Sequence, residues 1–120
     1  MSAESRVRRP RHPKPTVAQN AGRHIRRAAD IIEDRGWVQG TDGSKDRGFC
    51  IRGAVGYVVP EESFTLTWLV LHEWLRNIHG PGSAVAYNDE KGRTKEEVLF
   101  TLRKCADELD PGINRQVKGT

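Results

Sequence analysis

The stretch TVAQNAGRHIRRAADIIEDRG, residues 16–36, decides the fold. Its sequence Thr16-Val-Ala-Gln19 has the form of a capping box, and Gly36 supplies a residue suited to a left-handed helix end. We therefore expect a helix from Val17 to Arg35. Small and aliphatic side chains recur at steps of three and four along it, as on one face of an amphipathic helix; they are Val17, Ala21, Ile25, Ala28, Ala29 and Ile32.

Two more long helices are expected further along the chain. Ser63 is the expected cap of the first, and the sequence Asn77–Gly82 ends it. The second begins at the capping box Thr94–Glu97 and ends at Asp110. The apolar face of the helix after Ser63 consists of Phe64, Trp68, Leu71, Leu75 and Ile78. The apolar face of the helix after Thr94 consists of Val98, Leu99, Leu102, Cys105, Ala106 and Leu109.

The segment between the helix expected at Val17–Arg35 and the helix expected after Ser63 is rich in glycine. Residues 37–48 predict a loop or a short hairpin, and the small apolar run Cys50–Val59 predicts a short buried helix that Pro60 ends. Four amphipathic helices cannot bury their apolar faces alone, so we expect an all-α fold. This is a small helical bundle of three long helices and one short helix, with Trp68 and Leu71 central in its core.

The N-terminal segment has a different character. Residues 1–15 contain three prolines and almost no apolar side chain, which predicts a disordered or extended basic arm before a helical domain at 16–112 and a frayed C-terminus at 113–120. Residues 1–27 carry eight basic residues and one acidic residue, whereas the remaining 93 carry 12 basic and 15 acidic residues. The candidate phosphate- or partner-binding residues of this arm and the first helix are Arg6, Arg8, Arg9, Arg11, Lys14, Arg23, Arg26 and Arg27.

Several classes of protein are not expected from the sequence. The longest apolar run is too short to span a membrane, and no apolar segment of a secretory signal follows the first basic residues. No metal-ligand spacing and no phosphate loop occurs, so we expect neither a metal site nor a cofactor. Two cysteines 55 positions apart fit a reducing cytoplasm. Cys50 with His72 or His79 would be the nucleophile and base of a small cysteine-dependent enzyme, but the apolar neighbours of Cys50 indicate an ordinary buried thiol.

Four separated pieces carry a resemblance to a known family: Ala28–Gly40, Cys50–Ala54, Ala86–Asp89 and Gly92–Val98. Their order and spacing resemble a family of short proteins from actinobacteria and their phages that is catalogued as a domain of unknown function. The resemblance covers Ala28 to Ala106 and leaves out the arm. It implies a compact, soluble, cytoplasmic domain that is phage-borne or host-directed, and it implies no particular activity.

The matching pieces contain a set of polar and aromatic residues with two interpretations. Each member has a local structural explanation, such as a turn or a helix start, which favours a role in the scaffold. Alternatively, the loops converge and these side chains line one groove for a ligand or a peptide. The members are Trp37, Gln39, Tyr87, Asn88, Asp89 and Arg93.

The preferred functional hypothesis is a non-catalytic binding module that recognises a protein partner through this loop-lined groove, aided by the basic arm. The alternative is a nucleic-acid-binding protein whose arm and first helix contact phosphates, against which the acidic body argues. A cysteine-dependent enzyme is the remote third hypothesis. The sequence leaves the oligomeric state open.

Overall fold

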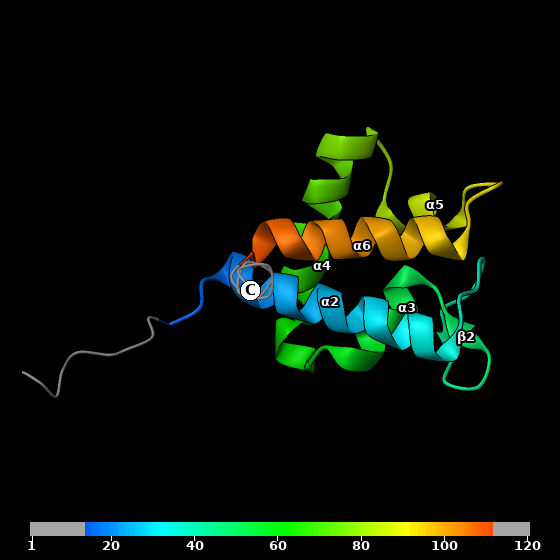
Figure 1. The fold of residues 1–120 in the computed structure, drawn as a ribbon, viewed down its shortest axis with the longest axis horizontal. Coiled ribbons are helices and arrows are strands. Elements are labelled where there is room, and N and C mark those ends of the chain that lie inside the picture. Colours follow the sequence, from blue (N-terminus) through cyan, green and yellow to red (C-terminus); the bar gives the residue numbers. More distant parts are fainter. Residues whose placement is uncertain (1–13, 112–120) are drawn as a thin grey trace, which may run out of the picture.

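The computed structural model describes residues 14–111, and most of them are helical (Figure 1). The first thirteen residues of the expected arm and the expected C-terminal tail lie outside the described residues. The elements in chain order are α2 (Val17–Arg35), β1 (Gly43–Ser44), β2 (Gly48–Phe49), α3 (Ile51–Val58), α4 (Glu61–His79), α5 (Ala84–Asp89) and α6 (Lys95–Leu109).

The first long helix is confirmed with the expected bounds. The Thr16 hydroxyl accepts a hydrogen bond from the Gln19 amide at 3.0 Å, and the Gln19 side chain accepts one from the Thr16 amide at 2.9 Å. Thr94 and Glu97 form the same reciprocal pair at the start of α6. Each capping box satisfies two amide groups that have no partner inside the helix, which fixes where these helices begin.

The core lies between α2, α6 and the other helices. Figure 1 shows α2 and α6 side by side, with α4 crossing this pair at a steep angle. Ala28 and Ile32 of α2, Leu71 of α4, and Val98 and Leu102 of α6 are fully buried. Leu71 therefore has the central position that the sequence predicted.

Three expectations for α4 are wrong. The helix begins two residues before Ser63, because Pro60 occupies the N-cap and Glu61 opens the first turn. Trp68 is partly buried at the edge of the core rather than at its centre, and the side chain of Ile78 is 51% exposed. Ile78 is exposed because it lies in the last turn of α4, and this end of the helix extends beyond α2 and α6 (Figure 1).

The connections contain one expected and one unexpected element. The hairpin β1–β2 pairs Gly43 with Phe49 and Ser44 with Gly48, as the glycine-rich loop indicated. The short helix α5, capped by the Ser83 hydroxyl, was not expected. The described chain therefore has two short helices beside the three long ones.

Candidate functional site

Asn88 is the centre of a buried polar network that joins α5 to the loop after α2. Its side-chain oxygen accepts hydrogen bonds from the Trp37 indole nitrogen at 2.7 Å and from the Ile51 amide at 3.1 Å. Its side-chain nitrogen donates to the Val38 carbonyl at 3.1 Å and to a carboxylate oxygen of Asp89 at 2.9 Å. The residue is 0% exposed. An amide is the side chain that supplies two acceptor sites and two donors at one position, so Asn88 satisfies this junction completely.

Gln39 and Asp89 extend the same junction to the surface. The Gln39 side chain donates hydrogen bonds to the carbonyl oxygens of Asn88 and Glu90, both at 3.0 Å. The Asp89 carboxylate accepts one from the Gly40 amide at 2.9 Å. We call the set Trp37, Gln39, Asn88 and Asp89 the clasp. It holds the loop after α2 against the end of α5.

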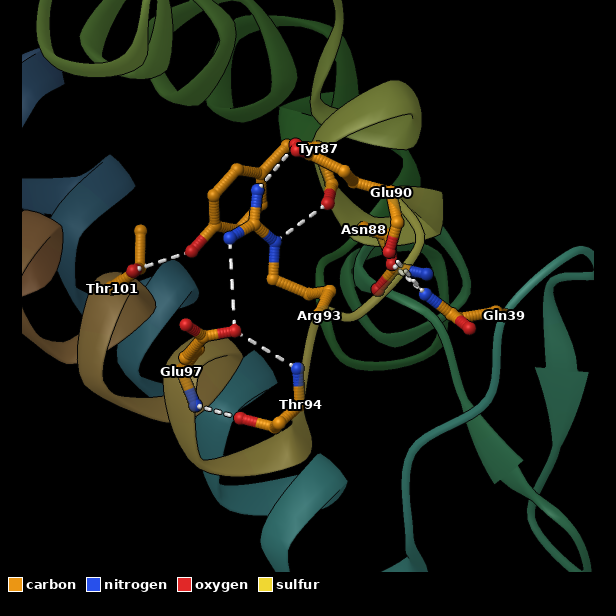
Figure 2. A network of polar contacts seen from close by, with 8 residues as sticks. All are labelled: Gln39, Tyr87, Asn88, Glu90, Arg93, Thr94, Glu97 and Thr101. Carbon is orange, nitrogen blue, oxygen red and sulfur yellow. Dashed lines mark hydrogen bonds and ion pairs between the residues drawn. The ribbon is translucent and has the colours of Figure 1, made fainter.

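Arg93 and Tyr87 form a second cluster beside the clasp (Figure 2). The Arg93 guanidinium lies 3.8 Å from the centre of the Tyr87 ring and donates to the Tyr87 carbonyl at 2.9 Å. It also donates to the Glu90 carboxylate at 2.8 Å, and Glu97 lies 3.7 Å away. The Tyr87 hydroxyl shares a 2.7 Å hydrogen bond with Thr101 on α6. These contacts fix α5 and the loop after it to the start of α6.

Two adjoining hollows lie where α4, α5 and α6 meet, and His79, Tyr87 and Arg93 line both of them. We call the two together the groove. One half, of about 390 Å³, is lined by the turn Gly80–Ser83 and Glu90 and is mainly polar. The other half, of about 420 Å³, is mainly apolar; its further lining residues include Trp74, Ile78, Phe100 and Lys104.

Phe100 stands out in the apolar half because its side chain is 69% exposed, more than any other large apolar residue among those described. Sequence reasoning missed it as a site residue and placed Ile78 in the core. The sequence places Phe100 outside the apolar face expected for α6, and this position could have marked it as a site residue. An aromatic residue outside that face either packs on a neighbouring element or is left for a partner.

The structure brings all six predicted groove residues into one region, with two different placements. Tyr87 and Arg93 line the groove. The four clasp residues do not line it, and each forms a hydrogen bond with another clasp residue or with a backbone group. Asn88 and Asp89 lie in the last turn of α5 rather than in an isolated turn. The role of the six residues in binding stays a prediction.

The pattern of a protein family covers this whole region. A family of unknown function, DUF6197, matches residues 16–108, which is most of the chain and includes both the clasp and the groove. The chain belongs to the DUF6197 family. The expected membership in a family of unknown function is thereby confirmed. No curated protein and no solved structure matches the chain significantly.

Most of the candidate basic residues lie outside residues 16–108, the part of the chain that the DUF6197 family model matches. Arg6, Arg8, Arg9 and Arg11 lie outside the described residues, and Lys14 is exposed. On α2, Arg26 donates to Asp107 at 3.0 Å and to Asp110 at 3.1 Å, and Arg23 lies 3.6 Å from Asp110. Asp30 on α2 accepts a hydrogen bond from Arg103 on α6. Arg27 is exposed.

Cys50 acts as a helix cap in the structure. Its sulfur accepts a hydrogen bond from the Gly53 amide at 3.3 Å and lies 3.7 Å from a carboxylate oxygen of Asp42. Burial raises the pKa of the Cys50 thiol, and the Asp42 carboxylate contributes to this direction, although the backbone amides oppose it. No hydrogen bond within residues 14–111 joins Cys50 to His72 or His79.

The described residues contain neither a metal-ligand cluster nor a helix able to cross a membrane. No group of three or more His, Cys, Asp or Glu side chains within residues 14–111 is arranged to hold a metal ion. In the same range, no helix combines the length and the apolar composition that crossing a bilayer requires.

Proposed function

We propose that the protein is a non-catalytic binding module that receives a protein partner in the groove between α4, α5 and α6. The observation that carries the proposal is the exposed apolar half of the groove, with Phe100 and Ile78 at its rim. Apolar side chains gathered beside polar groups are typical of sites for another protein. This proposal places the contact beside the clasp, with Tyr87 and Arg93 as the two predicted residues that take part.

The groove is held in shape by contacts that do not depend on a partner. Tyr87 is anchored to Thr101, and Arg93 is anchored to the Tyr87 carbonyl and to Glu90. Walls fixed in this way lose little conformational entropy when a partner binds, which favours affinity. The clasp also fixes α5, because it bonds the end of this helix to the loop after α2.

The chemistry of the groove defines the partner that we propose. Its apolar half suits an aliphatic or aromatic anchor side chain, and the Glu90 carboxylate and Ser83 in the polar half suit hydrogen bonds from a polypeptide. An origin in actinobacteria or their phages, a host-directed role and a cytoplasmic location belong to this proposal. Two buried free cysteines, Cys50 and Cys105, support the location.

The test is capture from an actinobacterial lysate by the full chain and two variants. Phe100→Ser removes the rim of the groove, and Tyr57→Ser removes an equally aromatic, more than half exposed side chain on α3 as a matched control. We expect a discrete protein, retained after nuclease treatment, on the wild-type chain and Tyr57→Ser but not on Phe100→Ser. Equal recovery by all three, or no recovery above a scrambled control, contradicts the proposal.

Nucleic-acid binding through the basic arm is the second proposal. It is supported by the five basic residues within positions 6–14 and by exposed Arg27. Arg23 and Arg26 weaken it, because their charges are already placed against Asp107 and Asp110. We expect such binding to fall steeply with salt and to require residues 1–15. Binding of duplex DNA or RNA that is insensitive to salt, or unchanged by the truncation, contradicts it.

A further inference from the structure

The helix α4 has a largely exposed outer face, at whose edge Leu66 borders a small hollow against α2. The side chains of Leu66 and Leu69 on this face are 53% and 56% exposed. Glu62, Glu73 and Arg76 surround them and are also exposed. Two exposed leucines in the middle of a helix are an apolar surface without a partner.

The charges on this face also lack partners. Glu62, Glu73 and Arg76 take part in none of the ion pairs formed within residues 14–111. On α6, by contrast, Arg103 is paired with Asp30 and Glu33 of α2. The outer face of α4 therefore has unpaired Glu62 toward one end, and unpaired Glu73 and Arg76 toward the other.

The positions of Glu62 and Arg76 are complementary across a twofold axis, whereas Glu73 would lie opposite Thr65 of the partner subunit. Leu69 lies seven residues after Glu62 and seven before Arg76, so the three share one side of the helix. If a second α4 lies antiparallel on this face, Leu69 meets Leu69 of the partner subunit and Glu62 meets Arg76 of the partner subunit. The twofold symmetry repeats the ion pair, and the antiparallel arrangement also aligns the helix dipoles favourably.

We propose that two copies of this chain form a dimer through antiparallel α4 helices, with the twofold axis at Leu69. The charge complementarity of Glu62 and Arg76 selects a second copy rather than another protein. The groove stays open in this dimer, because Trp74 and Ile78 lie on other sides of α4, and Trp74 donates to Glu108 of α6 at 2.8 Å. The inference is independent of the groove's function.

The size of the contact predicts its strength. One helix from each subunit buries less than the roughly 1,600 Å² of a standard interface. We therefore expect a dimer that dissociates on dilution in the micromolar range, as weak interfaces of about this size do.

The first test measures the mass of the full chain by sedimentation over a range of concentrations. Leu69→Lys should leave a folded monomer at every concentration, because it puts two like charges at the axis. Ile78→Lys is the matched control, since Ile78 is 51% exposed on the same helix but faces the groove, and it should dimerise as the wild type does. A wild-type chain that stays monomeric throughout, or a Leu69→Lys chain that still dimerises, overturns the proposal.

The second test exchanges the charges and checks the register. Glu62→Arg and Arg76→Glu should each weaken self-association by about tenfold or more, since each replaces two attractive pairs by two repulsive ones. An equimolar mixture of the two variants should restore the dimer, because both ion pairs reform across the twofold axis. Single variants that dimerise as tightly as the wild type, or a mixture no tighter than its components, overturn the antiparallel arrangement.

Discussion

At the scale of the residue, Asn88 shows how one side chain organises a site. It bonds to the loop after α2 through Trp37 and Val38 and to the start of α3 through the Ile51 amide. Three segments far apart in the sequence thus depend on one buried amide. Inside a protein such a network is favourable only when every polar group has its partner.

We expect Asn88→Ala to lower the free energy of unfolding by about 3 kcal/mol, because it leaves buried donors and an acceptor unpaired. Gln39→Ala is the control. The Gln39 side chain is exposed, so its carbonyl partners can bond to water instead, and the expected loss is about 1 kcal/mol or less. Urea denaturation of the three proteins measures both values. A loss for Asn88→Ala no greater than that for Gln39→Ala contradicts the central role of Asn88.

The sequence indicated which residues gather at the site but not what each contacts. Asn88 and Asp89 were assigned to a turn because such side chains bond to nearby backbone. Asp89 does accept from a backbone amide, but that of Gly40, which lies 49 positions earlier. Contacts between distant segments depend on how the helices pack, which no local pattern specifies. Phe100 was missed for the same reason, since its exposure of 69% depends on how the other helices pack around α6.

At the scale of the element, α3 shows why its two glycines are not equivalent. A Cβ atom on Gly53 would overlap the Asp42 carbonyl oxygen, whereas one on Gly56 would meet only a ring carbon of Phe64 at 3.9 Å. Gly53 therefore permits the close approach of α3 to the loop before the hairpin. Gly56 has no such role and costs the helix conformational entropy.

The two alanine variants should accordingly change stability in opposite directions. Gly53→Ala forces α3 away from the loop, and we expect a loss of about 2 kcal/mol or more in the free energy of unfolding. Gly56→Ala should raise the free energy of unfolding by about 0.5–1 kcal/mol. Thermal unfolding followed by circular dichroism compares them. Effects of the same sign would show that the Asp42 contact does not constrain α3.

The sequence predicts correctly the helices that have both a long periodic apolar face and a side-chain cap, but not the shorter helix or the start of α4. The helices α2 and α6 begin at capping boxes that the sequence displays, and their bounds agree with the expectation. The helix α5 has only six residues, too few for a periodic pattern to appear. At α4, Ser63 was a reasonable cap by residue type, but Pro60 already fixes a backbone conformation from which a helix can begin.

At the scale of the whole molecule, the reactivity of the two cysteine thiols can be used to follow how the helical bundle unfolds. Cys105 is fully buried on α6, and burial raises the pKa of its thiol to about 12. Cys50 lies at the start of α3 next to the small hairpin, and burial raises the pKa of its thiol too. Because the thiolate is the reactive form, we expect both thiols to react more slowly in the folded chain than in the unfolded chain.

We therefore expect different routes to alkylation for the two thiols. Modification of Cys105 requires the core to unfold, so its rate should follow global stability as urea is added. Modification of Cys50 requires only the hairpin to separate from α3, so it should be faster than that of Cys105 and less dependent on urea. Mass spectrometry after timed iodoacetamide treatment at pH 8 measures both rates, with the urea-unfolded chain as the control. If Cys50 in the folded chain reacts as fast as in the unfolded chain, its thiol is exposed and activated, and the remote hypothesis of a cysteine-dependent enzyme gains over the binding module.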